Sequence, residues 1–295
     1  MNKAWIVAFL IALMPSAAGA VTASEARRQL EHSLLVKGEI ETDAQGNVSS
    51  VTVEKPEKFP PGLVDFVTQQ ASRWKFEPVL VEGKPMRARS VMSLLVVAKK
   101  LPNKQVSIGI RNASFGRQAP KQGEYVFPLD MRPPVYPRGL AAKGVSGTVY
   151  VLLKVGRDGS VQDAAVEKVN LRVLAKESVM QSWREALSEA ALETLRTWRF
   201  SIPTTGQYAD DQTWSVWAPV DFGLFNEEGK PVDANGNAVA DSYGKWKTYV
   251  RGPSQPIRWL LEDRPGFSSD SLEEGGVYRA EDDKGPKLLT PLDRG

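Results

Sequence analysis

The residue types that commonly carry chemistry in enzymes and metal sites are sparse in this chain. Its 295 residues include one histidine, His32, and no cysteine. Zinc and catalytic sites usually combine several His, Cys or carboxylate side chains, so the isolated His32 favours a surface histidine over a ligand or base. Without cysteine, disulfides, thiolate metal ligands and a cysteine nucleophile are excluded.

Three polar residues have the spacing with which a calcium-binding loop begins. Asp233, Asn235 and Asn237 alternate along the chain, but such a loop also needs a central glycine and a closing bidentate glutamate. Ala238 and Gly244 stand at those two places. We therefore predict a turn there, and neither a metal ion nor a cofactor.

Two Glu-Lys pairs, Glu54-Lys55 and Glu167-Lys168, are the remaining candidates for paired charges. We expect them to be exposed charges at strand edges rather than catalytic groups. The chain has no Gly-x-Ser-x-Gly elbow and no P-loop, which are signatures of two large enzyme classes. The sequence predicts a protein that is not an enzyme.

The two Glu-Lys pairs belong to a longer pattern that occurs twice in the same order. The first copy has the turn Asp43 to Val48 and ends on Trp74-Lys75-Phe76; the second has the turn Arg157 to Val161 and ends on Trp198-Arg199-Phe200. A recurrence of turn, strand and helix-end signals indicates two copies of one small fold. The second copy carries an insertion within 170–185.

Each copy is expected to form a hairpin, a helix and a third strand. Residues 148–155 alternate apolar and polar side chains before the Gly-x-Asp-Gly turn, as in a half-buried hairpin. Apolar residues recur at helical spacing in both copies, at Leu63, Val67, Ala71 and Trp74, and at Leu187, Ala191, Leu195 and Trp198. The third strands are expected over 90–98 and 214–222. Trp74, Phe76, Trp198 and Phe200 are expected in the cores.

The predicted fold class is therefore α+β, with two small units that are each a three-stranded antiparallel sheet covered by a helix. The units span 30–98 and 133–224, and a linker over 99–132 joins them, with one short strand expected at 106–115. Residues 225–295 are rich in Gly, Pro, Asp and Lys and are expected to form an extended appendage in which Trp246 and Trp259 pack on a unit.

The N-terminus and the charge balance bear on location and partners. Lys3, the apolar run 4–14 and Ala18-Gly19-Ala20 have the pattern of a secretory signal over 1–20, cleaved after Ala20. The apolar run is shorter than the ~20 residues that span a bilayer. We expect a periplasmic protein. A formal net charge of +3 does not indicate a nucleic-acid partner.

The second copy contains an ordered set of motifs: Pro134-Val135-Tyr136-Pro137, Ala141, Gly144, Gly147 to Val151, Asp158-Gly159, Val161, Ala190 to Leu192, and Trp198 to Phe200. This set resembles the TonB C-terminal domain. The resemblance covers 133–224 well and 34–98 more weakly. It implies a periplasmic energy-transducer domain that binds outer-membrane transporters by accepting a partner segment as an added strand.

By this resemblance, the receiving edge is the third strand of the second copy. The residues implied are Trp214, Val216, Trp217, Val220 and Phe222. Pro219 suits an edge, because proline is tolerated on edge strands and disfavoured in central ones. Two alternatives are a peptidoglycan-binding or other glycan-binding module of the cell envelope and a homodimer formed through the exposed edge.

Overall fold

The computed structural model describes residues 30–101, 105–116, 123–225, 231–232, 243–260, 268–280 and 286–292. The predicted signal segment 1–20 and the predicted turn at Asp233, Asn235 and Asn237 lie outside these residues. None of the helices within them combines the length and apolar character needed to cross a membrane.

The described fold is a mixed α/β arrangement of antiparallel strands with few helices. The helices are α2 (Leu63–Ala71), α3 (Arg138–Ala141) and α4 (Glu177–Leu195), with single turns η1 (Pro56–Lys58) and η2 (Ser269–Ser271). The strands are β1 (Leu30–Thr42), β2 (Val48–Val53), β3 (Val79–Val81), β4 (Lys84–Met86), β5 (Ala88–Lys100), β6 (Val106–Gly116), β7 (Phe127–Asp130), β8 (Gly147–Gly156), β9 (Val161–Leu171), β10 (Arg199–Ser201), β11 (Thr213–Phe222), β12 (Leu224–Phe225), β13 (Pro231–Val232), β14 (Lys247–Val250) and β15 (Tyr278–Arg279).

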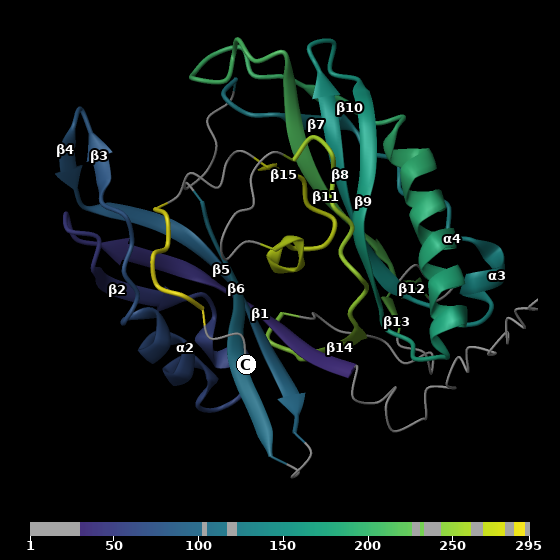
Figure 1. The fold of residues 1–295 in the computed structure, drawn as a ribbon, viewed down its shortest axis with the longest axis horizontal. Helices are drawn as coiled ribbons and strands as arrows, with labels where there is room; N and C mark the ends of the chain where they lie inside the picture. The colour runs from purple at the N-terminus through teal and green to yellow at the C-terminus, as the bar shows by residue number, and fades with distance from the viewer. Residues whose placement is uncertain are drawn as a thin grey trace, which may run out of the picture.

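Most of these strands form one nine-stranded sheet rather than two separate sheets. Its order is β15-β11-β8-β9-β14-β1-β5-β6, with β2 paired to β1 (Figure 1). The strands expected in the second unit, β8, β9 and β11, meet those expected in the first, β1, β2 and β5, through β14. The expectation of two independent three-stranded sheets is therefore corrected: β14 joins the two sets.

Both long helices cover the sheet with the apolar stripe expected from the sequence. Helix α4 buries Leu187, Ala191 and Leu195 in one apolar core with alternate residues of β8. Helix α2 buries Leu63, Val67 and Ala71 in a second core with β1 and β5. Helix α4 has 19 residues and α2 has nine, so much of the insertion in the second copy lengthens the helix.

The two hairpin turns share one local geometry. Gly46 and Gly159 have φ values of 80° and 72°, in the left-handed region that favours glycine. The N–H of Phe76 donates to the carbonyl of Gly46 at 2.8 Å, and that of Phe200 donates to Gly159 at 2.9 Å. A Cβ at either glycine would stand 2.1 Å from the carbonyl oxygen of Phe76 or Phe200. The turn and the helix-end aromatic therefore pack together in both places.

The four aromatic residues that follow the helices lie in the two cores. Trp74 and Phe76 pack in the core around α2, and Trp198 and Phe200 in the core around α4. The indole N–H of Trp198 donates to the carbonyl of Arg132 at 2.9 Å, which ties the end of α4 to the segment before α3.

The segments expected to be a linker and an appendage contribute to the sheet. Within 99–132, β6 pairs along β5 and β7 pairs with β10. Beyond residue 225, β14 lies between β9 and β1, and β15 pairs with β11. The expectation of an extended appendage over 225–295 is wrong for the described residues, because β14 joins β9 to β1 and β15 pairs along the outer edge of β11.

Candidate functional site: the outer edge of β11

Strand β11 has one fully paired side and one side that is only partly covered. Toward β8 it is paired from Thr213 to Phe222. On the opposite side, β15 pairs at two positions, Val216 with Arg279 and Trp217 with Tyr278. The N–H of Gly275 also donates to the carbonyl of Pro219 at 2.9 Å. The outer edge of β11 is therefore covered near its middle by a short strand of the same chain.

The backbone direction at Pro219 explains why a proline fits this strand. Since the Pro219 carbonyl accepts from Gly275, the backbone of this residue faces the outer edge. A residue directs its N–H and C=O to the same side of a strand, so the missing N–H of Pro219 falls on the outer side and costs no bond to β8.

The side chains implied as partner-binding residues are buried in the protein itself. Trp214, Val216, Val220 and Phe222 belong to the core under α4. Trp217 faces the other side of the sheet and packs with Leu152, Ile257, Leu272 and Ala280. All five implied residues therefore lie on β11 with buried side chains. The outer edge of this strand presents mainly backbone N–H and C=O groups to a partner.

Residues 268–280, which we name the capping segment, include β15, and the rest of the segment packs on the face of the sheet opposite α4. In Figure 1 the turn η2 of this segment lies between the strands of the two predicted units. The Ser93 hydroxyl of β5 donates to the carbonyl of Ser271 at 2.9 Å, and Lys168 of β9 reaches Asp270. The segment therefore contacts both halves of the sheet.

The first anchor of the capping segment is a buried ion pair. Lys168 and Asp270 lie 2.9 Å apart, with side chains only 1% and 2% exposed. Arg251 approaches the same carboxylate at 3.1 Å, and the Lys168 ammonium donates to the Ser268 hydroxyl at 2.9 Å. A buried charge needs such partners, because removal from water is costly.

The expectation of exposed charges is therefore wrong for Glu167 and Lys168, although it holds for the other pair. Glu54 and Lys55 are about half exposed. Glu167 accepts hydrogen bonds from Ser254 and Ser269 and Lys168 is buried. The physical reason is the capping segment, which covers one Glu-Lys pair and leaves the other in solvent.

The second anchor centres on Glu274. Its carboxylate lies 3.0 Å from Arg172 and 2.7 Å from Lys247, and the Thr148 hydroxyl donates to it at 2.8 Å. Burial raises the pKa of Glu274, but the charges of Arg172 and Lys247 outweigh it and hold the pKa at about 2. Asp221 of β11 also pairs with Arg172, yet burial raises the pKa of Asp221.

A cation–π contact, a tyrosine hydrogen bond and a cavity surround β15. The guanidinium of Arg279 stacks 3.4 Å from the ring centre of Tyr208, and the Tyr278 hydroxyl donates to the Glu273 carbonyl at 3.1 Å. A cavity of about 480 Å³ opens beside the strand, lined by Met92, Phe115 and Trp217 among others. Part of the surroundings of β15 is therefore unfilled space rather than packed core.

The capping segment is the part of the site that sequence reasoning missed. The apolar and β-forming residues Val277, Tyr278 and Ala280 after two glycines were the available signal, but a run this short does not identify a strand. Trp246 and Trp259 were expected to pack on a unit, and they pack against the core around α2 and against the Trp217 cluster, respectively.

The described residues contain no group of three or more His, Asp or Glu side chains that could hold a metal ion. His32 lies on β1, where its ring nitrogen is 2.8 Å from the Thr248 hydroxyl of β14. His32 therefore lies at the junction between the two halves of the sheet, where it links β1 to β14.

Comparison with known proteins finds similarity in one part of the chain. Residues 132–224 match the family described as Gram-negative bacterial TonB protein C-terminal. Protein TonB of Pseudomonas aeruginosa is 36% identical over 90 residues, which are 27% of this chain and 26% of that protein. Protein TonB of Xanthomonas campestris pv. campestris is 32% identical over 96 residues, 32% of this chain and 36% of the relative.

The chain thus spans about a quarter to a third of the length of these curated relatives. No solved structure matches it. The matched residues run from just before α3 into β12 and include β8, β9, α4, β10 and β11, so the candidate edge lies in the TonB-like segment while β15 lies outside it.

Proposed function

We propose that this protein binds an extended segment of a protein partner by strand addition along β11, as part of TonB-dependent transport across the outer membrane. The observation that carries the proposal is that β11 ends the long-strand part of the sheet with only a two-residue ladder on its outer side. The similarity of 132–224 to TonB C-terminal sequences supports the transport context. In strand addition, backbone groups provide the affinity, which suits an edge whose side chains are buried.

In this proposal β15 occupies the position on β11 that the partner strand takes when it binds. It occupies the middle of the β11 edge, so a partner segment that pairs along this strand must displace it. A two-residue ladder supplies few bonds, each worth ~1 kcal/mol net, and a longer partner strand can outcompete it. The free energy that holds the capping segment on the sheet must then be overcome by the partner, which lowers the partner's net affinity.

We further propose that 30–98 and 133–224 are two copies of one unit, the second with the binding edge and the first an accessory unit. The matching contacts of Gly46 with Phe76 and Gly159 with Phe200 support duplication, as does the shared order of hairpin, helix and long strand. The signal-like 1–20 supports export to the periplasm and cleavage after Ala20. A transporter is the partner proposed, and self-association through the same edge is the competing outcome.

The experiment uses a reversible lock on β15. The chain has no cysteine, and Val216 lies opposite Arg279, at a Cα spacing of ~4.5–5.5 Å that a disulfide can bridge. We expect reduced V216C/R279C to bind synthetic peptides from the plug segments of outer-membrane transporters, and the oxidised form to lose that binding. V79C/M86C, across the paired strands β3 and β4, is the control whose oxidation should change nothing.

Equal peptide affinity of the oxidised and reduced lock would contradict binding at this edge. Failure of every plug peptide to bind the reduced protein would contradict the transporter as partner. Concentration-dependent dimerisation that disappears on oxidation would instead assign the edge to a second copy of the chain.

A further inference from the structure

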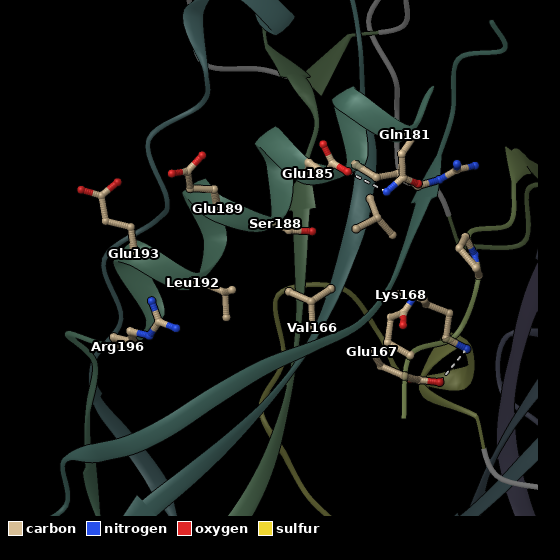
Figure 2. Close-up of a pocket in the computed structure, with 14 residues that line it drawn as sticks. Val166, Glu167, Lys168, Gln181, Glu185, Ser188, Glu189, Leu192, Glu193 and Arg196 are labelled. Carbon is tan, nitrogen blue, oxygen red and sulfur yellow. Dashed lines mark hydrogen bonds and ion pairs between the residues drawn. The ribbon is translucent and has the colours of Figure 1, made fainter. Parts of the chain in front are cut away.

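A second groove runs along the opposite side of the TonB-like segment, between α4 and β9. It has a volume of about 770 Å³ and includes Val166, Val169 and Leu192 among its lining residues. Figure 2 shows Ser188 and Leu192 of α4 and Val166 of β9 around the same space. An apolar floor between a helix and a strand is the shape into which an extended peptide can dock.

The outer edge of β9 is covered by the chain itself at both ends of this groove. Near its start, Ser160 forms an isolated bridge with Arg199. Near its end, Leu171 pairs with Val250, and the N–H of Gln255 donates to the carbonyl of Glu167 at 2.6 Å. The gap between these contacts is 161–166, and its last five residues are 162–166.

Within the part of the chain that the structure describes, no strand pairs with 162–166 on the side away from β8. Alternate residues of a strand direct their N–H and C=O groups to that side. Five residues at ~3.3 Å each give an open edge of about 16 Å, and Gln162 and Asp163 at its start are exposed. This open edge has the length of a pentapeptide strand.

The helix side of the groove carries an exposed row of carboxylates. Glu185, Glu189 and Glu193 are each four residues apart and exposed, and residues at this spacing share one face of a helix. The two buried cations of the lining are neutralised internally, since Arg184 pairs with Glu177 and Lys168 with Asp270. Arg196 is an exposed cation of the same lining, but the three carboxylates outnumber it, so the accessible charge along this side of α4 favours a basic ligand.

We propose that the α4–β9 groove binds an extended basic segment of a protein partner as a strand added to 162–166. Alternate side chains of the added strand face α4, so the segment carries Lys or Arg at its first and fifth positions and a small apolar residue at its third. The apolar side chain contacts Val166 and Leu192, and the basic ones pair with the glutamate row. This site is separate from the β11 edge, because β8 lies between the two strands.

The test measures fluorescence anisotropy of a labelled peptide, acetyl-Lys-Thr-Val-Thr-Lys-amide, titrated with the full-length protein. We expect it to bind at least about tenfold more tightly than the matching Glu-Thr-Val-Thr-Glu peptide, since opposite charges set specificity at such rims. The double variant Glu189→Lys/Glu193→Lys should reverse that preference. The lining residue Ser188 gives a steric test: Ser188→Trp should abolish binding, whereas Ser182→Trp, on an exposed position of the same helix, should not.

N-methylated peptides separate strand addition from simple charge attraction. One peptide carries N-methyl groups at positions two and four, and another at positions three and five. Because only alternate N–H groups of an added strand donate to the edge, one of the two should lose binding and the other should retain it. Equal binding of both, no effect of Ser188→Trp, or no binding of the basic peptide at millimolar protein would overturn the proposal.

The outcome is distinguishable from that of the β11 proposal. Oxidation of V216C/R279C closes the β11 edge and leaves 162–166 unchanged, so the basic pentapeptide should bind the oxidised and reduced forms with equal affinity. Loss of its binding on oxidation would show that the peptide had used the β11 edge instead.

Discussion

Tyr278 of β15 lies directly opposite Trp217 of β11, and this pairing places a strand of the chain's own C-terminal region on the edge proposed to receive a partner. The Trp217 side chain is buried and packs with Leu272 and Ala280 of the capping segment. The capping segment therefore has two roles in this structure: it covers one face of the sheet and closes part of its edge.

Weakening the β15 ladder should strengthen partner binding. Tyr278→Pro removes a backbone N–H and the extended pairing at this position. We expect the affinity for transporter plug peptides to rise about 5- to 30-fold, because two ladder hydrogen bonds contribute about 1–2 kcal/mol net. Titration calorimetry measures the change. Tyr278→Phe keeps the backbone and should bind as the wild type does; a gain in both variants would point to the side chain instead.

The buried pair of Lys168 and Asp270 should be a major anchor of the capping segment. Lys168→Met leaves the Asp270 carboxylate buried with one fewer cation, and loss of one partner of a buried ion pair costs about 3–5 kcal/mol. The matched control is Lys55→Met, at the equivalent but exposed place in the first unit, which should change the free energy of unfolding by less than ~0.5 kcal/mol. Equal effects in denaturant unfolding would contradict this account.

The pH dependence of stability should depend on Glu274. Its pKa is held at about 2 in the folded protein, against an ordinary value of 4.5. A carboxyl with a lowered folded-state pKa stabilises the fold fully above its unfolded pKa, and that contribution is lost as the pH falls toward 2. We expect Glu274→Gln to cost about 2–3 kcal/mol at pH 7, and the difference from wild type to shrink between pH 4.5 and pH 2. A difference that stays constant over this range would rule out the ion pairs as its cause.

The hairpin turn of the second unit should reject any side chain at Gly159. An alanine there would take on a left-handed φ, which costs about 1–2 kcal/mol, and its Cβ would also meet the Phe200 carbonyl oxygen at 2.1 Å. Gly83→Ala is the control, because Gly83 also has a positive φ, 76°, and nothing within 4 Å of the added Cβ. The melting temperature should fall further for Gly159→Ala than for Gly83→Ala; equal falls would mean that the turn can move away from Phe200.

The local elements of this fold could be predicted because each depends on nearby residues. The stripe of Leu187, Ala191 and Leu195 is set by the helical period, and the turn at Gly159 by glycine's access to positive φ. The joining of the two halves could not be predicted. Strand β14 has four residues, Lys247–Val250, and pairs only because β1 and β9 both present a free edge to it.

The same argument applies to the candidate site. The strand 214–222 could be anticipated from its place after the helix, and its role as the edge from the resemblance to the TonB C-terminal domain, with which Pro219 agrees. The burial of Lys168 could not, because a lysine is exposed by default and its partner Asp270 lies about a hundred residues further along the chain. Contacts of such long range leave no periodicity in the sequence.

The most direct test of the central claim is hydrogen–deuterium exchange of the full-length chain with and without a saturating transporter plug peptide. If the peptide adds to β11 in place of β15, the amides of 275–279 should lose protection on binding, while those of 213–222 should stay protected or gain protection. Peptide binding with protection of 275–279 unchanged would contradict the account, since β15 would then still occupy the edge.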